Sequence, residues 1–260
     1  MNPPSDCDMP LDDYERTRYD RQIRIFGEEG QRRLKRAKVF VAGVGGLGSP
    51  VLMYLAAAGI GHLKFTDKDV VALSNLNRQL LHWDRDVGER KPVSAVKKLT
   101  QLSPRTLLEP TIDTINEENV LGLVDGVNAV VDAMDNYATR ALLNRACVEK
   151  HIPLFHGAVH GLTGQATTII PGETPCFNCI FLVAPPPEIF PVLGSTAGVI
   201  GTIQATEVVK YLTGMGGLLK GKLLFYDGEQ MEFHKIEVKR NPECPICSKV
   251  WDGEPVKGSP

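Results

Sequence analysis

The chain has 260 residues, of which 43% are apolar and 23% are charged, and its formal net charge is −2. This length suits one large α/β domain, and the near-neutral charge gives no basic surface for nucleic acid or an anionic membrane. No stretch approaches the ~18 apolar residues of a membrane span, and the polar, acidic N-terminus lacks the regions of a signal peptide. We therefore expect a cytoplasmic protein with no nucleic-acid or membrane partner.

The first part of the chain alternates between short apolar runs and helical patterns. Residues 1–13 are expected to form a flexible leader, 14–250 one folded domain and 251–260 a C-terminal tail. The predicted helices are 14–37, 49–59, 91–102, 117–124 and 138–150, and the predicted strands are 38–42, 63–66, 106–110, 129–132 and 153–155. This alternation predicts a doubly wound parallel sheet.

The pattern changes after Gly161. The predicted elements there are a β-like segment, an exposed proline-rich loop, a helix and two antiparallel strands, at 165–170, 185–194, 197–212, 222–226 and 232–238. The predicted fold is therefore α/β: a Rossmann-like, doubly wound, mostly parallel sheet with an antiparallel extension.

A glycine-rich loop lies between the first predicted strand and the next helix. It contains Gly43, Gly45, Gly46 and Gly48. Glycines permit a tight turn and let backbone N–H groups approach a phosphate at a helix N-terminus. Asp67 follows Gly48 by 19 residues, at the end of the next strand, where a carboxylate can hold ribose hydroxyls. Alone, this pattern also allows NAD or FAD, or a loop that only packs a helix against a strand.

A cluster of amide, hydroxyl and cationic groups follows the ribose position. Its members are Ser74, Asn75, Asn77, Arg78, Gln79 and, at the start of the next predicted helix, Lys91. A triphosphate needs several fixed donors and cations, because departing pyrophosphate accumulates charge. Hydride transfer has no such need here, so the cluster favours ATP. Each residue taken singly also fits a solvated polar loop.

Two carboxylates and an amide follow a later strand. Asp132, Asp135 and Asn136 lie at or just beyond the end of strand 129–132, where ligands bind in open α/β sheets. A carboxylate at this edge can hold Mg²⁺ against triphosphate oxygens. The alternative is that one of the two carboxylates caps the next helix.

Four of the six cysteines form two C-x-x-C pairs 65 residues apart: Cys176, Cys179, Cys244 and Cys247. In a reducing compartment this spacing favours a closed, structural Cys₄ zinc site that ties down the C-terminal third of the chain. Redox chemistry through one pair is the alternative, but neither pair opens a helix after an early strand. Cys147 is expected to be a small buried residue.

From Tyr19 onward the chain resembles the HesA/MoeB/ThiF family, the bacterial and archaeal relatives of ubiquitin-activating enzymes. The matching segments are the glycine loop, both cysteine pairs and residues 19–23, 66–69, 74–79, 88–92, 132–136 and 198–210. The resemblance implies an enzyme that uses ATP to adenylate the C-terminal glycine carboxylate of a small ubiquitin-like sulfur carrier ending in Gly-Gly. Acyl-adenylate and pyrophosphate would be the products.

The resemblance also implies roles for single residues. Those at ATP are Gly46 in the phosphate loop, Asp67 at the ribose, Asn75, Arg78 and Lys91 at the phosphates, and Asp135 at Mg²⁺. By the same resemblance, Arg21 enters the neighbouring subunit's site as an arginine finger, so the active form would be a homodimer. From its own context, Arg21 is only one arginine on a basic helix. The four cysteines match the family's zinc ligands.

One departure from the family pattern concerns covalent transfer. Several relatives carry a cysteine just before the helix that includes Gly198, but here Ser195 and Thr196 stand near its place. We therefore expect the reaction to stop at acyl-adenylate. We also expect sulfur to come from a separate donor protein, since the sequence ends about a dozen residues after Cys247.

Several alternatives stay open at this stage. They are an NAD(P)-dependent oxidoreductase, a non-catalytic nucleotide-binding relative, a tRNA-modifying dehydratase and a peptide-adenylating enzyme. The donor cluster argues against the oxidoreductase. The presence of every matched ATP residue argues against the non-catalytic relative. The absence of a basic region and the presence of the cysteine pairs argue against the last two. The carrier and its pathway, whether molybdopterin synthesis, thiamine synthesis or tRNA thiolation, are not encoded in these motifs.

Overall fold

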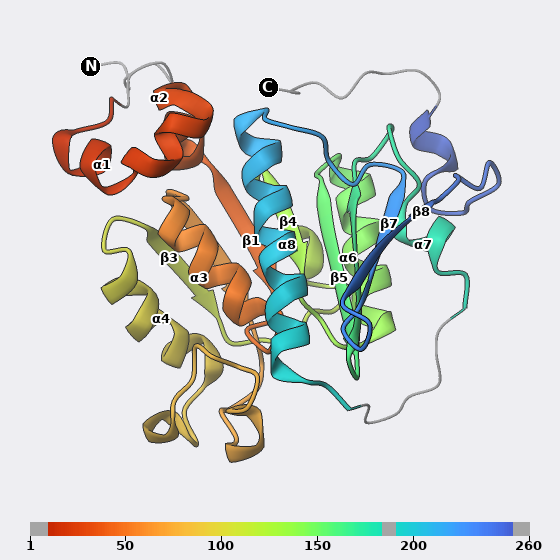
Figure 1. The fold of residues 1–260 in the computed structure, drawn as a ribbon. Coiled ribbons are helices and arrows are strands. Elements are labelled where there is room, and N and C mark those ends of the chain that lie inside the picture. Colours follow the sequence, from red (N-terminus) through yellow and green to blue (C-terminus); the bar gives the residue numbers. More distant parts are fainter. Residues whose placement is uncertain (1–9, 184–190, 252–260) are drawn as a thin grey trace.

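The computed structural model describes residues 10–183 and 191–251 (Figure 1). These residues build one eight-stranded sheet in the order β3-β2-β1-β4-β5-β6-β7-β8. The first five strands in this order pair in parallel, and β5 to β8 pair antiparallel. The strands are β1 Lys38–Ala42, β2 His62–Thr66, β3 Leu107–Thr111, β4 Ala129–Asp132, β5 Leu154–His160, β6 Thr163–Ile169, β7 Lys222–Asp227 and β8 Glu232–Glu237.

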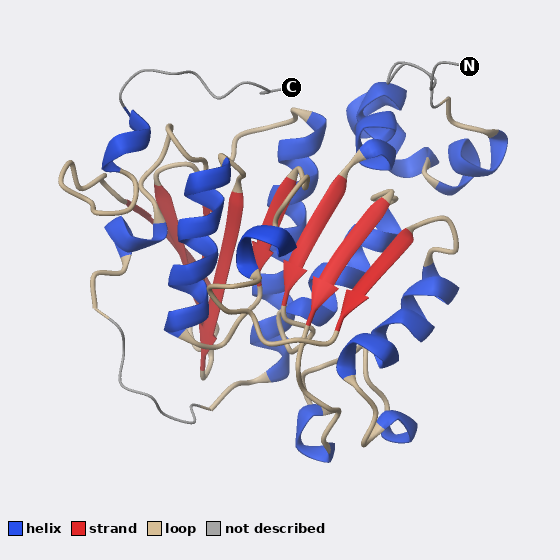
Figure 2. Ribbon diagram, turned by 180° about the vertical axis from the view of Figure 1, so that it is seen from behind, coloured by secondary structure: helices blue, strands red, loops and turns tan. Residues whose placement is uncertain are grey.

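Helices cover both faces of the sheet, as the two opposite views show (Figures 1 and 2). α3, α4 and α8 lie on one face, and α5 and α6 lie on the other. The helices are α1 Asp13–Arg18, α2 Asp20–Arg36, α3 Gly48–Ala58, α4 Lys91–Leu102, α5 Val120–Leu123, α6 Tyr137–Lys150, α7 Phe177–Ile180 and α8 Gly194–Thr213, with short 3-10 turns η1 Leu73–Asn75, η2 Asp84–Asp86 and η3 Ser248–Trp251. The predicted doubly wound sheet with an antiparallel extension is confirmed.

The strand order reverses beside β1. After β1 the chain adds β2 and β3 on one side, and it then returns to place β4 and β5 on the other side. All four residues of β4 are buried, as are four of the five in β1, which fits their continuous apolar sequences. Such a reversal opens a crevice at the carboxyl ends of the two central strands. The glycine loop and the segment after Asp132 both begin at this crevice.

The N-terminal region departs from the prediction of a single helix over 14–37. It forms two helices, because α1 ends at Arg18 and α2 begins at Asp20, and Gly27 then interrupts α2 with a φ of 72°. The folded part also includes residues 11–13, which we expected in the leader, since α1 begins at Asp13. Leu11 is buried, and the Asp12 carboxylate caps α1 by accepting the Glu15 N–H at 2.9 Å.

The antiparallel extension of the sheet ends in an exposed edge strand. All six residues of β8 are exposed, so this strand is held chiefly by its pairing with β7. Helix α8 begins at Gly194, three residues earlier than predicted. Within the predicted loop, residues 185–190 lie outside the described residues, as do 252–260 of the predicted tail. No helix in the described part of the chain combines the length and the apolar character that a membrane span requires.

Candidate active site and cysteine cluster

The glycine loop joins β1 to α3 and leaves no room for side chains at two positions. Gly43 has a φ of +97°, and a Cβ there would lie 2.7 Å from the Ala133 carbonyl oxygen. A Cβ on Gly48 would overlap the Gly43 carbonyl oxygen. The contact between the loop and the segment after β4 therefore requires a residue without a side chain at position 43. It brings Asp135, two residues beyond Ala133, to the same crevice.

Asp67 holds the glycine loop at the end of β2. One carboxylate oxygen accepts the Val44 N–H at 2.9 Å, and the other accepts the Asp69 N–H at 2.9 Å. A carboxylate oxygen can accept more than one hydrogen bond, so capacity for ribose hydroxyls remains. The sequence pattern suggested only the ribose role, and the bond to Val44 adds a structural one.

Two members of the predicted donor cluster, Arg78 and Gln79, lie against the glycine loop. The aliphatic part of Arg78 covers Gly46, where a Cβ would lie 3.5 Å from Arg78 Cγ, and the Arg78 guanidinium donates to the Ser74 carbonyl at 2.9 Å and to Asn77 Oδ1 at 3.0 Å. Asn75 Oδ1 accepts the Ala72 N–H at 3.0 Å.

Gln79 is buried next to the loop, and its amide nitrogen lies 3.6 Å from where a Cβ on Gly45 would stand. Its Oε1 atom has no hydrogen-bond partner in the described part of the chain. A buried acceptor without a hydrogen bond costs free energy unless a donor reaches it. Gln79 is therefore available to a ligand at the loop.

Lys91 lies at the start of α4 with only 5% of its surface exposed. Its ammonium pairs with Asp69 Oδ2 at 2.9 Å, and its backbone N–H donates to the Asp69 carbonyl at 3.0 Å. Asp69 itself is exposed, so one end of the ion pair faces solvent. The structure thus assigns Lys91 a partner that the motif reading did not single out.

Neither carboxylate at the end of β4 caps the next helix, so the alternative considered for them is wrong. The cap of α6 is Asn136, whose Oδ1 accepts the Thr139 N–H at 2.9 Å. Asp132 instead is fully buried, with Oδ2 2.7 Å from His156 Nδ1 and Oδ1 accepting the Met134 N–H at 3.1 Å. Asp135 is exposed and remains accessible to a ligand.

Two residues that the sequence analysis did not single out hold this segment. His156 on β5 is fully buried, and burial is the largest cause that lowers its pKa, against the opposing effect of Asp132. Arg140 on α6 donates to the Met134 carbonyl at 2.6 Å. Asp132 and Arg140 together therefore fix both backbone groups of Met134, the residue before Asp135. In the sequence, the one sign of such a role was a histidine within an otherwise apolar strand.

Arg21 lies at the opposite end of the sheet from the glycine loop. The adjacent Gln22 donates to the Ala58 carbonyl at 2.7 Å, at the C-terminal end of α3, whereas the loop is at the N-terminal end of that helix. Eleven helical residues span about 16 Å. Figure 1 shows the same separation: α2 is beside the start of β1, and α8 begins near the other end. Within one chain, Arg21 and the loop are not brought together.

Helix α8 begins at the glycine loop. The Ala197 Cβ lies 3.4 Å from where a Cβ on Gly46 would stand, so α3 and α8 both start at this place. Helix N-termini favour negative charge. Thr196 is buried and Ser195 is exposed, so Ser195 is the hydroxyl that faces solvent here.

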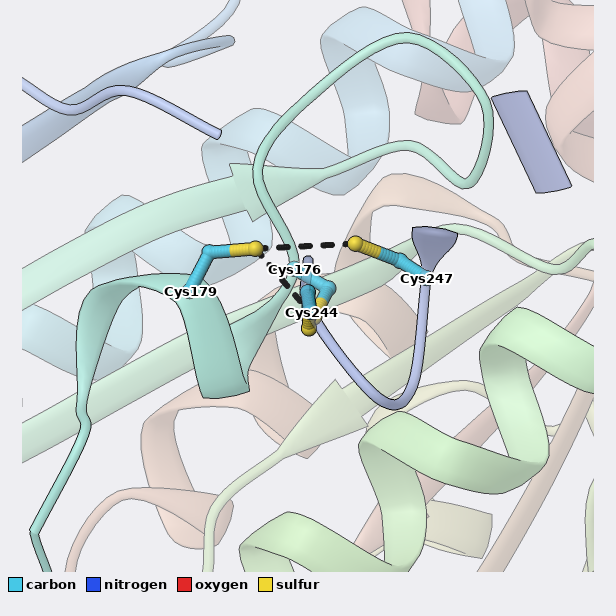
Figure 3. A group of neighbouring side chains, drawn as sticks. All are labelled: Cys176, Cys179, Cys244 and Cys247. Carbon is cyan, nitrogen blue, oxygen red and sulfur yellow. Dashed lines mark hydrogen bonds between the residues drawn. The ribbon is translucent and has the colours of Figure 1, made fainter. Parts of the chain in front are cut away.

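The four paired cysteines form one cluster (Figure 3). Their Sγ atoms all lie within 4.8 Å of one another, at 3.6 Å for Cys176 to Cys244 and 3.5 Å for Cys179 to Cys247. A tetrahedral zinc ion with Zn–S bonds of ~2.3 Å separates its sulfur ligands by about 3.8 Å. All four are free thiols in the structure. The donor set and its spacing therefore fit Zn²⁺, and the predicted convergence of the two pairs is confirmed.

The surroundings of the cluster explain why a cation suits it. Burial is the largest cause that raises the pKa of Cys176, followed by the charges of Cys247 and Cys179. Burial likewise raises the pKa of Cys247 to about 11. A bound metal compensates these costs and keeps the thiols deprotonated. Asn144 on α6 anchors the first pair by accepting the Phe177 N–H and donating to Asn178, both at 3.0 Å.

Comparisons with known proteins agree with this geometry. The sequence model of the ThiF family matches residues 19–246. The chain is 45% identical over 249 residues to the SAMP-activating enzyme E1 of Haloferax volcanii, covering 93% of this chain and 92% of that protein. It is 43% identical over 243 residues to the sulfur carrier protein adenylyltransferase of Thermus thermophilus, covering 88% of this chain and 90% of that protein.

A longer relative and a solved structure are also similar to this chain. The adenylyltransferase and sulfurtransferase MOCS3 of Anopheles gambiae is 42% identical over 253 residues, which cover 94% of this chain but 57% of that protein. The crystal structure of E. coli MccB with ATP has a TM-score of 0.81 at 22% identity, covering 92% of this chain and 77% of that chain. At that identity the likeness concerns the fold alone.

Proposed function

The chain belongs to the ThiF family, and from this premise we propose that it adenylates a small ubiquitin-like sulfur-carrier protein at the expense of ATP. The observation that carries the proposal is that Arg78 and Gln79 of the donor cluster and the segment leading to Asp135 all meet the glycine loop, at the reversal of strand order beside β1. An oxidoreductase with the same loop would have no use for that cluster.

The reaction is one displacement at phosphorus. A carboxylate oxygen of the carrier's C-terminal glycine attacks the α-phosphorus of ATP, the bond to the bridging oxygen breaks, and pyrophosphate departs with the electron pair. Catalysis of such a transfer depends on positioning and on the neutralisation of charge. The N–H groups of the glycine loop and the starts of α3 and α8 supply fixed positive ends for the phosphates.

Side chains complete the proposed site. Asp67 binds the ribose and, with Ser74, Asn77, Gln79 and Asn136, lines the nucleotide site, while Asn75, Arg78 and Lys91 contact the phosphates. Lys91 is already held at this edge by Asp69. Asp135 would hold Mg²⁺, which supplies charge neutralisation on the triphosphate when bound. The exposure of Asp135 and the fixed backbone of Met134 support this role.

Arg21 acts in a second subunit under this proposal. It lies about a helix length from its own glycine loop, on the far side of α3, and it is exposed. In a homodimer it would enter the partner's site and stabilise the charge that develops on the phosphates. Dimer formation would then be part of catalysis.

The proposed product is the free acyl-adenylate, and a separate protein would donate sulfur. The sequence from 180 to 198 contains no cysteine, and the exposed Ser195 is a far weaker nucleophile than a thiolate. The Cys176 cluster would bind Zn²⁺ in a structural role, since four thiolates leave no open coordination position. The compartment we propose is the cytoplasm, where thiols stay reduced.

The test is ATP–pyrophosphate exchange with a panel of small ubiquitin-like carriers that end in Gly-Gly. We expect exchange to require one carrier. It should fall by about 10³-fold in Arg21→Ala, by analogy with other arginine fingers, and also in Asp135→Ala. Arg24→Ala is the matched control, because Arg24 is an exposed arginine on the same helix and pairs with Asp20 at 3.0 Å.

Mixing the two inactive variants separates the trans arrangement from a local one. A heterodimer of Arg21→Ala and Asp135→Ala subunits contains one intact site, so an equal mixture should regain about one quarter of wild-type exchange. No recovery after subunit exchange would reject the trans arginine. Absence of exchange with any carrier, despite ATP binding, would reject the sulfur-carrier substrate.

A further inference from the structure

A series of buried, hydrogen-bonded side chains contacts the glycine loop from its buried side. Lys98 Nζ lies 2.8 Å from Ser94 Oγ, Ser94 Oγ lies 2.9 Å from His82 Nδ1, and His82 Nε2 lies 3.0 Å from the Val44 carbonyl oxygen. The three side chains are buried by nine tenths or more. We call this set the His82 relay. Its outer end is the ion pair of Lys98 with Asp86.

Donor and acceptor chemistry fixes the hydrogens at both ends of the relay. An ammonium only donates, so Lys98 donates to Ser94 Oγ, and a carbonyl only accepts, so His82 Nε2 carries the hydrogen. Burial is the largest cause that lowers the pKa of His82, and the charges of Lys91 and Lys98 add to it. The imidazole is therefore neutral, and its Nδ1 accepts the Ser94 hydroxyl hydrogen. Every group in the relay is then satisfied.

The relay ends on the peptide unit that carries the Gly45 N–H. The Val44 N–H is fixed by Asp67 at 2.9 Å, and the Val44 carbonyl is fixed by His82. Because a peptide unit is planar, holding the Val44 carbonyl also sets the direction of the Gly45 N–H. A hydrogen bond to the carbonyl polarises the unit and strengthens that N–H as a donor. The Gly45 N–H has no acceptor within the described ranges.

We propose that His82 is a positioning residue for ATP binding: it donates from Nε2 to the Val44 carbonyl and so aims the Gly45 N–H at a phosphate. Ser94 and Lys98 fix the imidazole tautomer that makes this donation. His82 touches neither ATP nor the carrier, because it contacts the loop's carbonyl from the buried side. The inference rests on the proposed use of ATP and adds a second layer to that site.

The experiment measures ATP binding by calorimetry without a carrier, together with the amide NMR signal of Gly45 in glycine-labelled protein. His82→Phe removes both hydrogen bonds, and we expect the Kd for ATP to rise about tenfold. His82→Gln can keep the donor and the acceptor, and its Kd should stay within about threefold of wild type. Ser94→Ala should fall between them, and adding it to His82→Phe should have no further effect.

Leu99→Ala controls for loss of stability alone. Leu99 is fully buried one position after Lys98 but is not part of the relay. It should lower the melting temperature and leave both the Kd and the Gly45 signal unchanged, whereas His82→Phe should shift that signal before ATP is added. If His82→Phe does not fold, Ser94→Ala and His82→Gln still carry the comparison.

Three results would overturn the proposal. They are an unchanged Kd in His82→Phe, a Kd in His82→Gln as weak as in His82→Phe, and an equal weakening in Leu99→Ala. Wild-type protein that binds no ATP would reject both the relay and the adenylation function. Normal wild-type binding with an unaffected His82→Phe variant would reject the relay alone.

Discussion

Different interactions stabilise two parts of the molecule: the nucleotide half, residues 38–160, and the clip half, residues 163–251, which carries the four clustered cysteines. In the nucleotide half, β1 and β4 are buried on both faces and form the centre of the apolar core. In the clip half, β8 has no buried residue. Apolar burial stabilises by about 25 cal/mol per Å², so the first half rests on its core. The second half adds buried side chains such as Ile200 and Val208 to that core. Its edge strand β8 adds none, so we expect this edge to depend on the cysteine cluster.

Helix α8 connects the two halves. Its start lies at the glycine loop, and in its middle Gln204 donates to the carbonyls of Asp132 and Phe155 at 2.8 and 2.9 Å. Further along, the Glu207 carboxylate accepts from the Thr168 hydroxyl at 2.6 Å and the Leu219 N–H at 2.7 Å. Damage to the cysteine cluster can therefore reach the active site through α8, and also through β5, which pairs with β6 and carries His156 beside Phe177 and Phe181.

The largest effect should follow loss of the proposed zinc ion from the cysteine cluster. Structural zinc contributes on the order of 10 kcal/mol of apparent binding free energy in small domains. We expect Cys247→Ser to reduce zinc well below one ion per chain and to speed hydrogen exchange in β7 and β8 by orders of magnitude. β1 and β4 should change little. Metal analysis and exchange mass spectrometry are the measurements, and equal acceleration in β1 would show that the halves are not separable.

A smaller effect, confined to the nucleotide half, is expected from Gly48→Ala. Its Cβ would overlap the Gly43 carbonyl oxygen, so the loop must move, at a cost of about 3 kcal/mol of unfolding free energy. ATP affinity should also fall, while zinc content stays at the wild-type level. Gly122→Ala on α5 is the control, because nothing lies within 4 Å of its Cβ. Urea unfolding that ranks the two variants equally would contradict this account.

The smallest effect is the pH dependence of stability. The pKa values of His82 and His156, both in the nucleotide half, are lowered mainly by burial. A histidine with a lowered folded-state pKa binds its proton preferentially in the unfolded chain, so unfolding free energy is lost as pH falls below about 6.5. Each can contribute up to ~1.4 kcal/mol per pH unit.

The measurement is urea unfolding at several values between pH 7 and 5.5. His82→Gln should flatten the slope while keeping the stability at pH 7, because it retains the relay's hydrogen bonds without a titrating group. If the unfolding free energy of His82→Gln depends on pH as steeply as that of wild type, groups other than His82 cause the acid sensitivity.

Much of the fold was accessible from local patterns. Apolar runs with intervening helices predicted the parallel strands, and the glycine loop and both cysteine pairs were visible because their spacing is itself the signal. The break at Gly27 was missed because a helical pattern tolerates a single glycine. The cap of α6 could not be chosen from the sequence, because aspartate and asparagine are equally suited to a cap and the partners of each side chain decide between them.

The sequence by itself determined that this chain alternates strands with helices, that a phosphate-type loop follows the first strand, and that four cysteines could share one metal. Only the tertiary structure decided that His82 and His156 lie behind the loop and the Asp135 segment, and that Arg21 lies at the far end of the sheet from its own glycine loop. The reason is physical: spacing encodes local hydrogen bonding, whereas these contacts join residues 24 to 38 positions apart, as for His156 with Asp132 and His82 with Val44. Such contacts arise only when the sheet and its helices close around a common core.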